Sequence, residues 1–203
     1  MTWKDLKLVV LQKVFAVSDG RVVEDDTTRE YLTAMPGAAN EGLQLLVTAG
    51  RFIKKCVPIR QDGTGTGWNR YDLSELVEDF YSLDADGVYF EDRGSYRRGA
   101  DWTMEAGHVF VLSADRAGSW TVWYNAYPPE LTADTPDSYE LPLYPEVAAL
   151  LPLYIASQVY KDDDVSIAVQ YRNEFEVGRD ALMGASQRGH MGRDNWTSTT
   201  GWF

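Results

Sequence analysis

The spacing of apolar residues changes twice along the chain, and this change limits the folds that the chain can adopt. Over 1–51 and 142–183, apolar residues recur every three or four positions, which is typical of amphipathic helices. Over 52–141, short runs rich in valine, isoleucine and aromatic residues alternate with turn segments such as QDGTGTG and ADRAGS. That pattern is typical of antiparallel strands. The sequence therefore predicts an α+β protein with helices at both ends.

Each end of the chain predicts a pair of helices. The first helix opens with a weak capping box made by Thr2 and Asp5, and the N-terminal pair is separated by a break at Gly20. The C-terminal pair begins at Pro145, and an aspartate of the KDDD segment, 161–164, can cap its second helix. The apolar stripe of that last helix is spaced by 3, 4, 3 and 4 residues and consists of Ala168, Tyr171, Phe175, Gly178 and Leu182.

Neither helix pair can bury its apolar stripe alone. We therefore expect a four-helix bundle built from the N- and C-terminal pairs, over 1–51 and 142–183. The two helices of the second pair should be antiparallel, because only a few residues connect them. An inserted antiparallel, sandwich-like β domain is expected over 52–141. An extended C-terminal tail is expected over 184–203, because glycine, serine and threonine dominate there.

The charge of the chain bounds its partners. Among 203 residues, 31 are acidic and 19 are Lys or Arg, so the formal net charge is -12. Because affinity for duplex DNA comes mainly from Lys and Arg contacts with phosphates, such a chain can lie next to DNA but should not bind it. Cys56 is the only cysteine, which excludes an internal disulfide and predicts a buried, inert thiol in a cytosolic protein. We expect a soluble protein, because the sequence shows no signal peptide and no apolar run of about 20 residues.

The residues that could carry chemistry do not form a recognisable motif. His108 and His190 accompany no nucleophile motif, and the acidic cluster before the last helix suits the helix dipole better than a metal. The DADG segment, 84–87, reads as a hairpin turn rather than a calcium loop. We therefore expect no enzyme activity, cofactor or metal. A hydrolase that uses Glu75 and Asp79 as paired carboxylates is a further alternative.

Aromatic residues stand out in two regions. Those of the β segment predict either a buried sandwich core or an exposed face that binds carbohydrate or another surface. At the C-terminus, Trp196, Trp202 and Phe203 lie among residues that cannot build a core. They predict either an unstructured end without a role or a segment whose aromatics a partner buries.

The order of these segments resembles a known family. The stretch ELPLYPEVAALLPLYIASQVYKDDDVSIAVQYRNEFE, with the helical N-terminal region and a β segment between them, is similar to head-to-tail connector (adaptor) proteins of tailed bacteriophages. The likeness extends to about residue 183 and rests on pattern and order rather than on one invariant motif.

This resemblance implies a structural protein of the virion neck, assembled in the host bacterial cytoplasm. Such proteins form a ring, commonly of twelve copies, that joins the capsid portal to the next neck or tail protein and lets DNA pass. The resemblance also implies that the C-terminal extension reaches the portal. Trp196, Trp202 and Phe203 would then contact the portal or a neighbouring subunit.

Overall fold

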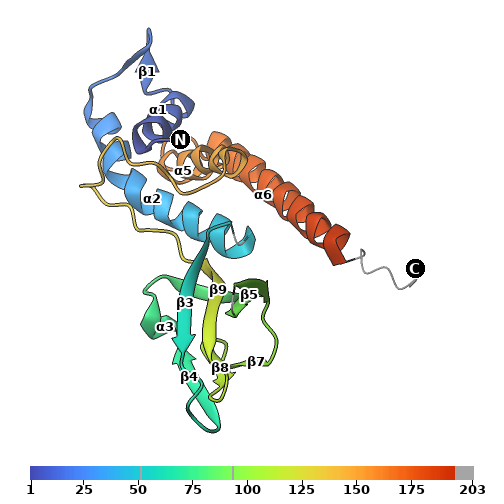
Figure 1. The fold of residues 1–203 in the computed structure, drawn as a ribbon. Coiled ribbons are helices and arrows are strands. Elements are labelled where there is room, and N and C mark those ends of the chain that lie inside the picture. The colour runs from blue at the N-terminus through green and yellow to red at the C-terminus, as the bar shows by residue number, and fades with distance from the viewer. Residues whose placement is uncertain (51, 93, 195–203) are drawn as a thin grey trace. The chain divides into compact units, whose positions relative to one another are not determined.

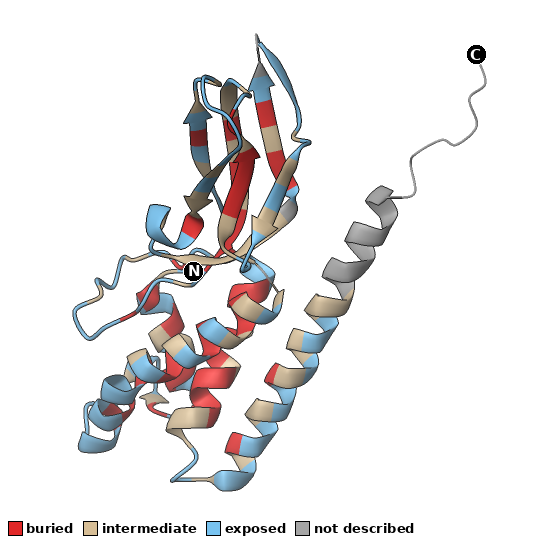
Figure 2. Cartoon of the chain, turned by 90° about the horizontal axis from the view of Figure 1, so that it is seen from below, coloured by how far each residue is buried: buried red, intermediate tan, exposed pale blue. Residues whose placement is uncertain are grey.

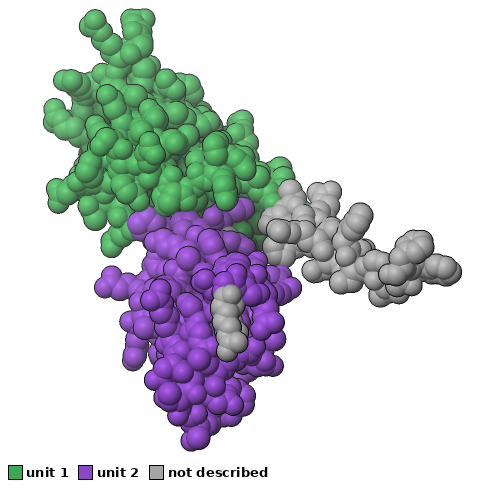
Figure 3. Space-filling model, viewed as in Figure 1, with its two compact units in different colours: residues 1–50, 130–203 green, residues 51–129 purple. Residues whose placement is uncertain are grey.

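A computed structural model describes residues 1–50, 52–92 and 94–194, with side chains described except at 85, 92 and 185–194. The chain divides into two compact units (Figure 3). Unit 1 combines residues 1–50 with residues 130–203, and unit 2 consists of residues 51–129.

Unit 1 is built from helices and one small hairpin (Figure 1). Its elements are α1 (Trp3–Lys13), β1 (Val17–Ser18), β2 (Arg21–Val22), α2 (Asp26–Gly50), α4 (Pro145–Ala148), α5 (Leu151–Val159) and α6 (Val165–Asp194). The predicted capping box of α1 is confirmed, because the Asp5 amide donates to Thr2 Oγ1 and the Thr2 amide donates to Asp5. Asp164 caps α6 as predicted, since its Oδ1 accepts from the amides of Ser166 and Ile167 at 2.9 and 3.1 Å.

The core of unit 1 lies where α5 packs against α1, α2 and α6 (Figure 2). The side chains at its centre are apolar and almost fully excluded from water; they include Leu6, Val10, Met35, Leu43, Leu46, Leu151, Ile155 and Phe175. Gly42 lets α5 approach α2 closely, because a Cβ at this position would lie 2.7 Å from Leu151 Cδ1 and 2.8 Å from the Tyr154 ring. Burial of such side chains is the main source of stability in this unit.

Unit 2 contains two antiparallel sheets. Its elements are β3 (Lys54–Gln61), β4 (Trp68–Asp72), α3 (Leu73–Leu76), β5 (Phe80–Asp92), β6 (Ser95–Arg98), β7 (Trp102–Glu105), β8 (Val109–Ser113) and β9 (Gly118–Ala126). The four-stranded sheet has the order β3-β9-β5-β6, and the three-stranded sheet has the order β4-β8-β7. Side chains from both sheets and from α3 share one core; those buried in it are Ile59, Leu73, Val88, Phe90, Phe110, Leu112, Trp120 and Val122.

The DADG segment does not form a hairpin turn, so that prediction was wrong. It lies inside β5, at a shift in the pairing of β5 with β9 between Leu83 and Val88. Asp84 pairs with Lys54 of β3 at 2.6 Å, and Asp86 pairs with Arg98 of β6. These ion pairs join the segment to β6, its neighbour in the sheet, and to β3, and the segment stays in the sheet as an irregularity of one strand.

The prediction of a four-helix bundle with an inserted antiparallel β domain and an extended tail was also wrong. The described part of the chain is α+β, but it is rich in sheet, with three sheets and with helices α4, α5 and α6 where two helices were expected. Pro152 lies in the first turn of α5, where its missing N–H is tolerated. The helix is therefore interrupted before it, between α4 and α5. A strand pair, β1 with β2, fills the predicted break after α1. Helix α6 continues to Asp194, through part of the expected tail, because extending an existing helix needs no new nucleus.

Candidate functional site

One face of helix α6 packs against the other helices of unit 1. Ala168 and Phe175 are buried, and the Phe175 ring lies 5.0 Å from the Tyr154 ring in an edge-on arrangement. A Cβ at Gly178 would lie 2.5 Å from Leu150 Cδ2, so the helix comes close to the chain before α5 at this point. The predicted stripe of α6 is therefore its core-facing side at these positions.

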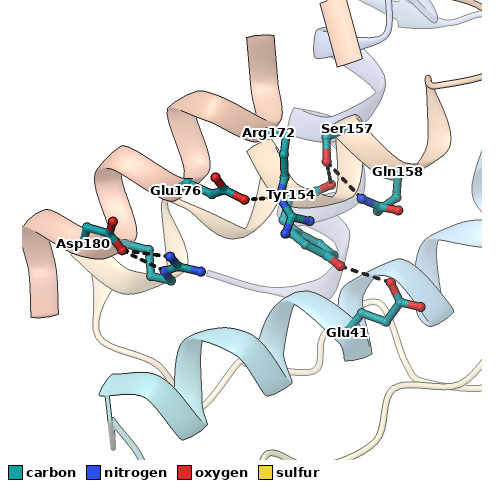
Figure 4. A network of polar contacts seen from close by, with 8 residues as sticks. Glu41, Tyr154, Ser157, Gln158, Arg172, Glu176 and Asp180 are labelled. Carbon is teal, nitrogen blue, oxygen red and sulfur yellow. Dashed lines mark hydrogen bonds and ion pairs between the residues drawn. The ribbon is translucent and has the colours of Figure 1, made fainter. Parts of the chain in front are cut away.

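Polar contacts hold this core-facing side in place (Figure 4). The Tyr154 hydroxyl donates to Glu41 of α2 at 3.1 Å, and the Arg172 guanidinium lies 4.9 Å from the centre of the Tyr154 ring. Arg172 also donates to Glu176 at 2.8 Å, and this hydrogen bond raises the pKa of Arg172. The contacts join α2, α5 and α6, so the orientation of α6 in unit 1 is defined by charge as well as by packing.

The opposite side of α6 is apolar but exposed. Val165, Val169 and Val177 are 67%, 51% and 72% exposed. Around them a shallow groove is lined by Ser166, Val169, Gln170, Asn173, Glu174, Val177 and Gly178. We call Val165 together with these groove residues, except the core-facing Gly178, the outer face of α6. The sequence did not single it out, although the valines recur at multiples of four residues, because the stripe through Phe175 has the same helical period.

The chemistry of the outer face suits contact with another protein. Glu174 is its one ionisable side chain, and it accepts a hydrogen bond from Gln170 at 3.1 Å. Valine is a poorer helix former than alanine by roughly half a kcal/mol, and each exposed valine leaves apolar surface in water. Within the described chain these valines therefore lower the stability of α6 slightly. Burial against a second protein surface would offset this loss of free energy.

A second hollow surface lies elsewhere on unit 1. Trp3 and Lys7 of α1, Leu32, Thr33 and Pro36 of α2, and Thr132 and Ala133 of the segment after β9 line a groove of about 300 Å³, which we call the α1–α2 groove. Lys7 is its cation; it lies 5.6 Å from the Trp3 ring centre and pairs with Asp137 at 2.5 Å. In Figures 1 and 2 the segment after β9 runs on the side of α2 away from α6. The two surfaces thus lie on different sides of unit 1.

The site residues named from the sequence, Trp196, Trp202 and Phe203, lie outside the described residues. Cys56, expected to be buried, is instead exposed on β3. It alternates with Val57 and Ile59, which face the core, so its side chain falls on the outer side of the strand.

Asp79, one of the two carboxylates considered for hydrolysis, is held by Lys55 and Tyr124. Asp79 accepts from Lys55 Nζ at 2.5 Å and from the Tyr124 hydroxyl at 2.8 Å. Burial acts to raise the pKa of Asp79, but the hydrogen bonds from Lys55 and Tyr124 outweigh it and lower that pKa. Glu75 is exposed on α3. A general acid needs a raised pKa, so Asp79 is unsuited to that role.

His108 and Ser74 both contact Asp72, but the serine hydroxyl is not directed to the imidazole. Its Nε2 lies 3.6 Å from Asp72, and its Nδ1 lies 2.9 Å from the Ala106 carbonyl oxygen. Ser74 donates its hydroxyl to Asp72 at 2.6 Å rather than to the imidazole. Asp72 is the N-cap of α3, and the Ser74 hydrogen bond lowers the pKa of its carboxyl. Asp72 and Ser74 therefore form a helix cap rather than part of a catalytic site.

The aromatic residues of unit 2 divide between its core and its outer sheet face. Phe90, Trp120 and Tyr124 are buried. Strand alternation places Tyr89 and Tyr96 on the outer face of the four-stranded sheet, where their rings stack at 5.1 Å with planes 7° apart. Tyr96 is 57% exposed.

Among the described residues, no group of three or more His, Cys, Asp or Glu side chains could hold a metal ion. The same part of the chain contains no helix with the length and apolarity that a membrane span requires. No protein-family model matches the chain, and no curated protein matches its sequence.

Proposed function

We propose that this protein is a structural ring protein of a tailed-bacteriophage neck, which joins the capsid portal to the next neck or tail protein. The observation that carries the proposal is the outer face of α6, an apolar helix face that the described chain leaves uncovered. A closed ring needs two different surfaces on each copy, and the α1–α2 groove supplies a second one.

Three further features support the proposal. The resemblance of the segment order to phage connectors is the basis for the portal as partner. The net charge of -12 suits a lumen through which DNA passes without binding. Trp196, Trp202 and Phe203 offer large apolar side chains for the portal or a neighbouring copy. The expected ring contains twelve copies, and its place is the virion neck.

The proposal is tested by the mass of the purified full chain in light scattering, alone and after mixing with DNA-filled, portal-bearing capsids. We expect a defined number of copies on each capsid, close to twelve. A chain that leaves the capsids unoccupied contradicts the proposal.

The role of the C-terminal aromatic residues is tested with a matched pair of variants. Replacing Trp196, Trp202 and Phe203 by alanine should abolish capsid attachment, because it removes the side chains that we expect the portal to bury. Replacing Thr197, Ser198 and Thr199 by alanine changes the same segment but keeps the aromatics, so attachment should persist. Equal attachment by both variants would exclude the aromatics from docking.

A second candidate function is a module that binds carbohydrate or another surface. The stacked, partly exposed pair of Tyr89 and Tyr96 on the outer sheet face favours it, because sugars pack on aromatic rings. A glycan array probed with the full chain and with Tyr96→Ala tests this function. Specific binding that the substitution removes would support it over the ring protein.

A further inference from the structure

We infer that the outer face of α6 packs into the α1–α2 groove of a second copy of this chain, so that copies associate head to tail. The inference rests on the proposed function, because it names the contact by which a ring would close. It commits to a second copy as the occupant of both surfaces.

The first argument is charge. Each copy carries a net charge of -12, so two copies repel one another unless they meet at surfaces of low charge. The outer face of α6 carries one carboxylate, that of Glu174, and the α1–α2 groove carries one ammonium group, that of Lys7. Lys7 already pairs with Asp137 at 2.5 Å, so the groove carries little net charge, and mating the two surfaces joins regions of low charge.

The second argument is polarity. Val169 and Val177 line a shallow, exposed surface of α6, and Leu32 and Pro36 line the α1–α2 groove. Both surfaces expose apolar atoms, and Leu32 is 36% exposed. Docking a helix face into an apolar groove is a common mode of recognition.

The third argument is geometry. An α6 helix that pairs with the α6 of another copy buries the same surface twice and stops at a dimer, with both α1–α2 grooves empty. A contact between two different surfaces, which lie on different sides of unit 1, repeats from copy to copy. Only the second arrangement can build a ring.

Disulfide cross-linking of the full chain distinguishes the two arrangements. Cys56 is exposed, so it is first replaced by serine. Leu32→Cys and Val169→Cys are then introduced separately and together, and the chains are oxidised at high concentration in about 0.5 M NaCl, which screens the net charge. We expect a ladder of dimers, trimers and larger species from the double variant, at least tenfold above either single variant.

Two results would overturn the inference. Efficient dimers from Val169→Cys alone, with no ladder from the double variant, would show that α6 pairs with α6. A chain that sedimentation velocity finds monomeric at every concentration, with cross-linking at the level of the single variants, would show that the two surfaces do not meet.

A charge and polarity control guards against a general effect of substitution. Val169→Asp should weaken self-association at least tenfold, whereas Val23→Asp, at an exposed valine outside both surfaces, should leave it unchanged. Capsid binding is measured separately with the same variants. A cross-linked ladder without capsid binding would support the contact between the two surfaces and contradict the proposed neck function. Capsid binding without the ladder would support the neck function and contradict this contact.

Discussion

Both sides of α6 carry apolar residues, but the described chain covers only one of them. The core-facing side holds Phe175, fully buried against Tyr154, whereas the outer face holds Val177, which is 72% exposed only two residues further on. The core-facing side explains how unit 1 is stable, and the outer face indicates where unit 1 meets another molecule. Substitutions on the two sides should therefore have opposite patterns of effect on stability and on association.

The largest effect is expected for Phe175→Ala on the core-facing side. Removing a fully buried ring loses its transfer free energy and leaves a cavity, so the free energy of unfolding should fall by about 3–5 kcal/mol. Urea denaturation of the full chain, followed by far-UV circular dichroism, measures the change. A loss below about 1 kcal/mol would contradict the packing of α6 against α5.

The next largest effect is expected at Gly42, where α5 approaches α2 closely. Gly42→Ala should destabilise unit 1 by about 1–3 kcal/mol, because the new methyl group would overlap Leu151 and the Tyr154 ring. Gly37→Ala lies on the same helix with no atom within 4 Å, and it should stabilise the chain by up to about 1 kcal/mol. Thermal unfolding of both variants measures the contrast, and a shift in the same direction for both would contradict the close approach of α5 to α2.

A smaller effect, which depends on pH, is expected at Tyr171 of α6. Its hydroxyl donates to the Lys13 carbonyl oxygen at 2.9 Å, so Tyr171→Phe should cost about 0.5–1.5 kcal/mol near neutral pH. Burial, with the nearby Glu174 and Tyr160, raises the pKa of Tyr171 above its usual value near 10.

The raised pKa determines the sign of the pH dependence. Above about pH 10 the folded state keeps a proton that the unfolded state releases, so this stabilisation is complete below that pH and is lost as pH rises. The free energy of unfolding should therefore fall less steeply above pH 10 in Tyr171→Phe than in the natural chain. Equal slopes in urea titrations between pH 9 and 11 would contradict the assignment.

The smallest effect on stability is expected at Val169 on the outer face. Val169→Ala should stabilise the monomer by no more than about 0.5 kcal/mol, because alanine is the better helix former and no packing is lost. The same change should weaken self-association in sedimentation velocity. A clear loss of stability would mean that the chain itself covers this face, which would remove the reason to expect a partner there.

Local signals in the sequence predicted several parts of this structure. The capping box at Thr2 and Asp5, the cap at Asp164 and the stripe through Phe175 depend on residues within one or two turns of each other. The bundle and the DADG turn were predicted wrongly because distant segments decide them. Lys54 pairs with Asp84 across 30 residues, and a new helix, α5, begins at Leu151 within a core formed with α1 and α2.

The sequence by itself determined the acidic charge, the alternation of helical and strand segments, and the helical period of α6. Those properties follow from composition and from contacts between near neighbours in the chain. Only the tertiary structure decided which side of α6 is buried, because Phe175 and the three outer valines fit the same helical period. The choice depends on Tyr154 and Leu150, which meet α6 through folding and so leave Val165, Val169 and Val177 for another surface to cover.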